Sequence, residues 1–72
     1  MNQLQRICKE LTKGWRSEMD LNQGLMIANS WGRVSDGKAK GMECQERKRK
    51  TKNGSTYIER RMTQKEYKRF YK

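Results

Sequence analysis

The dipeptide Asn53-Gly54 constrains the fold of this chain more than any other feature. Asn-Gly between two extended runs is typical of the tight turn of a β-hairpin. The flanking runs read ECQERKRK and STYIERRM, so the hairpin is expected over about residues 42–62. A segment with helical spacing, about residues 27–40, comes directly before it and ends at Gly41. The pattern therefore predicts a helix that leads straight into a hairpin.

Two registers are available to this hairpin. A two-residue loop pairs Lys48 with Glu59 and puts Cys44 and Ile58 on opposite faces. A three-residue loop, residues 52–54, pairs Lys48 with Ile58 and Cys44 with Met62. A slip of one residue would turn the apolar face to water, which favours the three-residue loop. That register collects Met42, Cys44, Ile58 and Met62 on one face and leaves Arg47, Arg49, Tyr57 and Arg61 on the other.

Three further helices are expected. The apolar residues Leu4, Ile7, Cys8 and Leu11 recur at the spacing of one helix face, which predicts a helix over about residues 2–13. Ser17 has the form of an N-cap for a helix over about residues 18–23, with Met19 and Leu21 facing inward and Gly24 as its stop. Trp15, just before it, is expected to pack over the core.

The C-terminal segment has the form of a capped helix. Thr63 and Glu66 stand in the spacing of a capping box, which predicts a short helix over about residues 64–71. A helix this short is marginal in water, so it is expected to dock on the body through Tyr67, Phe70 and Tyr71. The whole chain, residues 1–72, is expected to form one α+β domain.

The charge balance indicates an anionic partner. Lys and Arg total 18 against 8 acidic residues, a formal net charge of +10 on 72 residues, and nucleic acid is the leading candidate.

No stretch is apolar enough for a signal peptide or a membrane span, which favours the cytoplasm. With no His and only Cys8 and Cys44, neither a metal nor a cofactor is expected, and both cysteines fit better as small buried residues than as a disulfide. Scattered carboxylates without a nucleophile–base pair argue against an enzyme.

The order of elements resembles the winged helix-turn-helix family, and specifically the small DNA-binding domains of phages and prophages. The resemblance covers about residues 2–63 and rests on MNQLQRICKELTKG, GRVSDGKAKGMEC and RKRKTKNGSTYIERRM. The run R-V-S-D followed by Gly41 is similar to a motif of that family. Gly37 stands where the family usually has Leu, and Met42 where an aromatic residue is common. A glycine at position 37 predicts a less rigid third helix.

The resemblance implies that the third helix enters the major groove of double-stranded DNA and that the hairpin, as the wing, lies on the backbone or minor groove. Asn29, Ser30 and Arg33 are the expected base contacts, because Asn suits adenine and Arg suits guanine. Helix capping for Asn29 and Ser30, and an ion pair of Arg33 with Asp36, are the alternatives. The expected backbone contacts are Lys38, Lys40, Arg47, Lys48, Arg49, Lys50, Lys52, Arg60 and Arg61. Like charges facing each other across the hairpin are expected to destabilise the free protein.

Several functions remain open at this point. A transcription regulator and an excisionase-like architectural factor that self-associates cooperatively on DNA both fit a nucleoid-associated protein of a bacterial host. The basic hairpin could instead bind RNA, with Tyr57 stacking on a base. A third alternative is a phage-encoded inhibitor that binds an acidic surface of a host protein.

Overall fold

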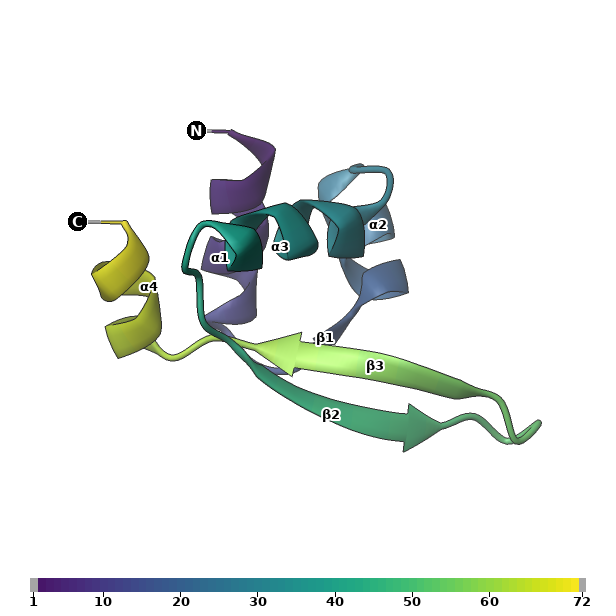
Figure 1. Ribbon diagram of the computed structural model, residues 1–72. Helices are drawn as coiled ribbons and strands as arrows, with labels where there is room; N and C mark the ends of the chain where they lie inside the picture. Colours follow the sequence, from purple (N-terminus) through teal and green to yellow (C-terminus); the bar gives the residue numbers. More distant parts are fainter. Residues whose placement is uncertain (1, 72) are drawn as a thin grey trace.

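Four helices and a three-stranded antiparallel sheet make up the computed structural model, which describes residues 2–71 (Figure 1). The α+β class expected from the sequence is confirmed. The elements are, in chain order, α1 (Gln3–Leu11), β1 (Arg16–Ser17), α2 (Glu18–Leu25), α3 (Ser30–Ala39), β2 (Gln45–Lys50), β3 (Thr56–Arg61) and α4 (Gln64–Phe70).

The core lies where α1, α2, α3 and the base of the hairpin meet. Its fully or almost fully buried side chains come from every part of the chain: Ile7, Cys8, Leu11, Leu21, Ile27, Val34, Met42 and Met62. Both cysteines are free, as expected, and burial raises the pKa of the Cys8 thiol to about 11. Cys8 is fully buried and packs in the core.

Helix α2 is fixed at its start by a local sequence signal and at its end by an unusual backbone. The Ser17 hydroxyl accepts from the Asp20 amide at 3.1 Å, and the Asp20 carboxylate accepts from the Ser17 amide at 3.0 Å. The predicted stop at Gly24 is wrong, since the helix runs through to Leu25. The prediction that Met19 faces inward is also wrong, because its side chain is 67% exposed. Leu21 is the residue of α2 that is buried in the core.

Met26 caps the end of α2 in the left-handed conformation, with φ +54°, and its side chain is 91% exposed. Residues with a Cβ pay a steric cost there that glycine avoids. Met26→Gly is therefore expected to raise the free energy of unfolding by about 0.5–1 kcal/mol. Chemical denaturation of the two proteins measures this difference. A lower stability of the glycine variant would mean that the exposed Met26 side chain has a stabilising contact.

Helix α3 begins three residues later than the sequence predicts, at Ser30 rather than residue 27. Ile27 lies in the preceding turn, and Asn29 adopts the left-handed conformation with φ +58° and makes no side-chain capping bond. The cap comes from α2 instead. The Asn22 side-chain oxygen accepts from both the backbone amide and the hydroxyl of Ser30, at 3.1 and 2.5 Å.

A second side chain of α2 completes this cap. A Glu18 carboxylate oxygen accepts from the Trp31 amide at 3.0 Å. The first amides of a helix have no partner within the helix and need one from outside. Asn22 and Glu18 are the acceptors for two of these amides, so α2 and α3 are joined by hydrogen bonds as well as by packing.

Gly37 brings α3 close to α1. The residue is buried, and a Cβ at this position would lie 2.9 Å from Leu4 Cδ2 and 3.0 Å from Met42 Sδ. The lower rigidity that this glycine predicts for the third helix stays a prediction. The absent side chain is what allows the two helices to approach, and packing replaces the helix propensity that glycine lacks.

The sheet has the strand order β1-β3-β2. Strand β1 was not expected, and it pairs Arg16 with Arg60 and Ser17 with Glu59. The three-residue loop is confirmed, because Lys48 pairs with Ile58, the Thr51 amide donates to the Ser55 carbonyl at 2.8 Å, and Gly54 has φ +84°. Ile58 is not buried as the pattern predicted, being 37% exposed, because the outer half of the hairpin extends beyond the helices.

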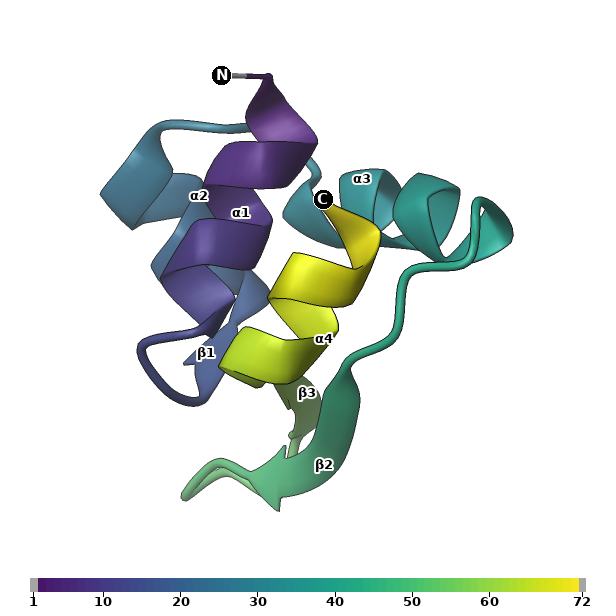
Figure 2. The ribbon, with the colours of Figure 1, turned by 90° about the vertical axis from the view of Figure 1, so that its left-hand side faces the viewer.

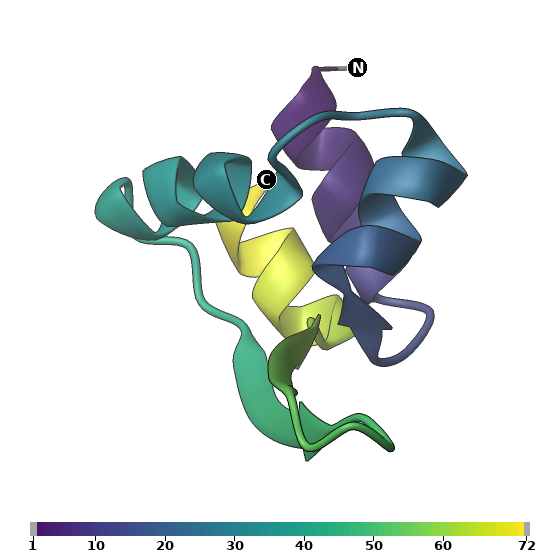
Figure 3. The same ribbon diagram turned by 90° about the vertical axis from the view of Figure 1, so that its right-hand side faces the viewer.

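The hairpin and α4 give the molecule its elongated shape, with extents of 41 × 22 × 22 Å. Figure 2 shows α4 beside α1, above the base of the hairpin, and Figure 3 shows α3 and α2 on opposite sides of the view with the hairpin below them. Thr63 and Glu66 form the expected capping box. Tyr67, Phe70 and Tyr71 pack against the core, so the predicted docking of α4 is confirmed.

Candidate nucleic-acid interface

The outer half of the hairpin extends beyond the helices, and α3 lies at the surface of the helical body (Figure 1). Helix α3 buries Ser30, Val34 and Gly37. At about 3.6 residues per turn, these lie on one side of the helix, and the rest of its surface is left to solvent. The exposed residues of α3 and its C-cap are Arg33, Ser35, Asp36, Lys38, Ala39 and Lys40.

The three expected base contacts lie in different environments. Arg33 is exposed on α3 and forms an ion pair with Asp36, with 3.8 Å between Nη1 and Oδ2. Asn29 is exposed at the start of α3, where its amide fills the space that a side chain at Gly32 would occupy. Ser30 is wrong as a base contact, because it is fully buried and its hydroxyl donates to Asn22.

The facing charges in the hairpin are arranged differently from the expectation. Arg47 lies opposite Glu59, and Glu46 lies opposite Arg60. The remaining basic residues of β2 face Ile58, Tyr57 and Thr56 rather than other cations. Opposite charges across a strand pair are stabilising and like charges destabilising. Contrary to the expectation, no cation of β2 therefore directly faces a cation of β3.

Two glutamates each form ion pairs with two cations at the base of the hairpin. Glu59 Oε1 lies 2.8 Å from Arg47 Nε and 3.7 Å from Arg49 Nε. Glu46 accepts from Arg60 Nε at 2.7 Å and from Lys38 Nζ at 3.1 Å. Four of the nine expected backbone contacts, Lys38, Arg47, Arg49 and Arg60, thus already have an acidic partner.

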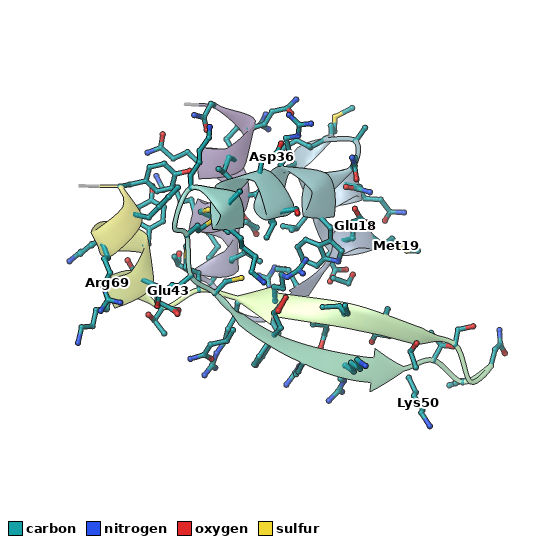
Figure 4. All side chains as sticks on the ribbon, in the orientation of Figure 1. Glu18, Met19, Asp36, Glu43, Lys50 and Arg69 are labelled. Carbon is teal, nitrogen blue, oxygen red and sulfur yellow. The ribbon has the colours of Figure 1, made fainter. Side chains whose placement is uncertain are left out.

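The other five expected backbone contacts are Lys40, Lys48, Lys50, Lys52 and Arg61, and within residues 2–71 none of them forms an ion pair with an acidic side chain. All five are exposed. Arg61 is nevertheless held, since its Nε donates to Gln45 Oε1 at 2.6 Å. Three of the remaining four, Lys48, Lys50 and Lys52, lie in the outer half of the hairpin, and Lys50 points away from the helical core (Figure 4). Among the nine expected backbone contacts, those without an acidic partner therefore lie mostly in the outer half of the hairpin.

Two tryptophans hold the base of the hairpin. Trp15 does not pack over the core as expected, but lies against the guanidinium groups of Arg47 and Arg61, at 4.3 and 5.0 Å from its ring centroid. Trp31 of α3 stacks on Arg60 at 4.5 Å. Each of these cation–π contacts is worth on the order of 0.5–2 kcal/mol. Together they fix guanidinium groups that would otherwise be free to reach a ligand.

A groove of about 740 Å³ runs between the start of α2 and strand β3. Met19, Trp31, Tyr57 and Ile58 supply its apolar lining, and Glu18 and Asp20 stand on its α2 side. Figure 4 shows Glu18 and Met19 on α2 beside the hairpin. Carboxylates repel phosphate, so the α2 side of this groove is unsuited to a phosphate backbone.

Glu46 makes the stability of the hairpin base dependent on pH. Its hydrogen bond from Arg60, followed by that from Lys38, lowers the pKa of the carboxyl from its ordinary value of 4.5. A carboxyl with a lowered pKa in the folded state stabilises the protein above its unfolded pKa, and this contribution is lost as the pH falls through the folded value. Below about pH 4.5, the wild type is therefore expected to lose stability more steeply than Glu46→Gln. Urea denaturation at pH 6 and pH 3 measures the two losses, and equal losses would contradict the role of Glu46.

No protein-family model, curated protein or solved structure matches the chain. Within residues 2–71, no helix combines the length and the apolar character needed to cross a bilayer.

Proposed function

We propose that the chain is a winged-helix domain that binds double-stranded DNA, with α3 as the recognition helix and the β2–β3 hairpin as the wing. The order helix, strand, two helices and hairpin, with β3 between β1 and β2, is compatible with that fold. The major groove of DNA is about 12 Å wide and admits a helix, and the exposed side of α3 is the surface that would enter it. Arg33 and Asn29 remain the proposed base contacts.

The observation that carries this proposal is the division of charge along the hairpin. At its base, Arg47, Arg49 and Arg60 have acidic partners in Glu46 and Glu59, whereas Lys48, Lys50 and Lys52 in its outer half have no acidic partner within residues 2–71. Exposed lysines on a projecting hairpin suit phosphates, which position a protein on DNA without reading its sequence. With Lys40, they provide four phosphate contacts. Arg47, Arg49 and Arg60 serve the fold in the free protein.

A titration against duplex DNA at several salt concentrations tests the proposal. Four phosphate contacts correspond to a log–log slope of about −3.6, from about 0.9 per contact on a duplex. Single-stranded RNA of the same length is titrated alongside. Tight duplex binding with that slope supports the proposal, whereas a slope shallower than about −2 contradicts it. Sigmoidal binding on a long duplex would add cooperative self-association, which suits an architectural factor more than a lone regulator.

The same titration tests the other functions. Tyr57, 37% exposed and opposite Arg49, is available to stack on a base, so stronger binding to RNA than to duplex DNA would select an RNA-binding function. If neither nucleic acid binds at low salt, the hairpin lysines serve an acidic protein surface instead, and the DNA-binding proposal is wrong.

A further inference from the structure

Glu46 is the acidic residue that joins α3 to the hairpin. Its two carboxylate oxygens lie 3.1 and 3.2 Å from Lys38 Nζ, near the end of α3. The same carboxylate lies 2.7 Å from both Nε and Nη2 of Arg60, on the neighbouring strand β3. One side chain of β2 thus connects three elements.

Arg60 extends this connection back to α3. Its guanidinium group is mostly buried, with 14% of the side chain exposed, and stacks on the ring of Trp31 at 4.5 Å. Trp31 stands at the start of α3 and Lys38 near its end. Seven residues of helix separate them, a distance of about 10.5 Å along the axis. The hairpin therefore contacts α3 at two points. Two contacts fix the angle between the hairpin and α3, whereas a single contact would let the hairpin rotate about it.

Glu59 has a different role. Its ion pairs, to Arg47 and Arg49, remain within the hairpin. Glu43 differs as well, because it is 63% exposed and pairs with Arg69 of α4 at 3.5 Å (Figure 4). Among the acidic residues of the β2–β3 hairpin and the segment leading into it, Glu46 is the one whose ion pairs reach α3.

We propose that Glu46 is a positioning residue that sets the angle between α3 and the hairpin, and that it thereby serves the discrimination between DNA sequences rather than total affinity. This inference rests on the proposed function. Base contacts require side chains placed to within a fraction of an ångström, whereas long lysine side chains reach phosphates from many orientations. Removing the Glu46 charge also frees Lys38 and Arg60 for phosphate. Loss of Glu46 therefore weakens sequence discrimination while it strengthens non-specific binding.

The test compares Glu46→Gln with Glu43→Gln, which removes the same charge without touching α3. A preferred site is first selected from random duplexes with the wild type. The affinity of each variant is then measured for that site and for a scrambled duplex.

Both variants are expected to bind the scrambled duplex more tightly than the wild type. The ratio of the two affinities is expected to fall at least about tenfold for Glu46→Gln and to stay within about twofold for Glu43→Gln, since tenfold corresponds to a single lost base contact. Equal ratios for the two variants would overturn the proposal.

A measurement without DNA separates this inference from the proposed function. Residual dipolar couplings of backbone amides report the relative orientation of α3 and the hairpin in the free protein. The couplings of both elements are expected to fit the wild-type arrangement in Glu43→Gln and to depart from it in Glu46→Gln.

An unchanged orientation in Glu46→Gln would refute the positioning role even if duplex binding is found. A changed orientation in a protein that binds no duplex would refute the proposed function alone. Should Glu46→Gln not fold, Glu46→Asp, which keeps the charge but shortens the reach, takes its place in both measurements.

Discussion

Replacing Lys48, Lys50 and Lys52 together with glutamine is expected to reduce duplex affinity about a hundredfold at 0.15 M salt. Each phosphate contact contributes about 0.9 to the log–log slope, so three lost contacts make the slope shallower by about 2.7. The physical cause is the release of fewer counterions from the DNA. Fluorescence anisotropy of a labelled random duplex at several salt concentrations measures both quantities.

The matched control replaces Lys9, Lys65 and Lys68 with glutamine. These three lysines are exposed on α1 and α4, and the change removes the same charge. The control is expected to lose no more than about threefold in affinity, because exposed charges beyond the Debye length of about 8 Å are largely screened at 0.15 M salt. Equal losses in the two triple variants would show that net charge, and not the hairpin, governs binding.

The largest expected effect on stability comes from Gly37→Leu. A Cβ at this position would lie 2.9 Å from Leu4 Cδ2 and 3.0 Å from Met42 Sδ, so the further atoms of Leu require the Leu4 and Met42 side chains to repack in the core. Overpacking of this kind costs about 1–3 kcal/mol, and more where the backbone cannot move. We expect the free energy of unfolding to fall by at least about 2 kcal/mol, a decrease in Tm of roughly 10 °C for a domain of this size. Thermal and urea denaturation measure these values.

Gly24→Ala provides the opposite control within the same protein. Gly24 lies inside α2, and a Cβ there would meet no atom within 4 Å. Ala at an open helical position is expected to stabilise the protein by about 1 kcal/mol. If Gly37→Leu were as stable as the wild type, the close approach of α1 and α3 would not depend on the missing side chain.

The sequence predicts the elements whose signals are local. Asn53-Gly54 and the alternation of apolar residues indicate the hairpin and its register, and the capping residues Ser17 and Thr63 mark the starts of α2 and α4. The start of α3 could not be predicted in this way. Its cap lies on another helix, at Asn22, and a left-handed residue, Asn29, precedes it. Strand β1 is two residues long and carries no pattern of its own.

The candidate interface was predicted less completely than the fold. Arg33 and the hairpin lysines are exposed as expected, whereas Ser30 is buried and its hydroxyl donates to Asn22 on α2. The glutamate partners of the basic residues could have been found from the sequence, because the three-residue loop places Arg47 opposite Glu59 and Glu46 opposite Arg60. The tryptophan stacking could not, since it depends on how the helices sit against the sheet.

The hydrogen bonds from α2 to the start of α3 have a consequence for genetic experiments. Asn22 and Glu18 hold the first turn of α3, and neither is among the proposed contacts to DNA. If the proposed function is correct, a screen for loss of DNA binding will recover substitutions at these two positions together with those at Arg33. A map of such mutations would then trace two separate patches, and only the patch on α3 and the hairpin would mark where DNA lies.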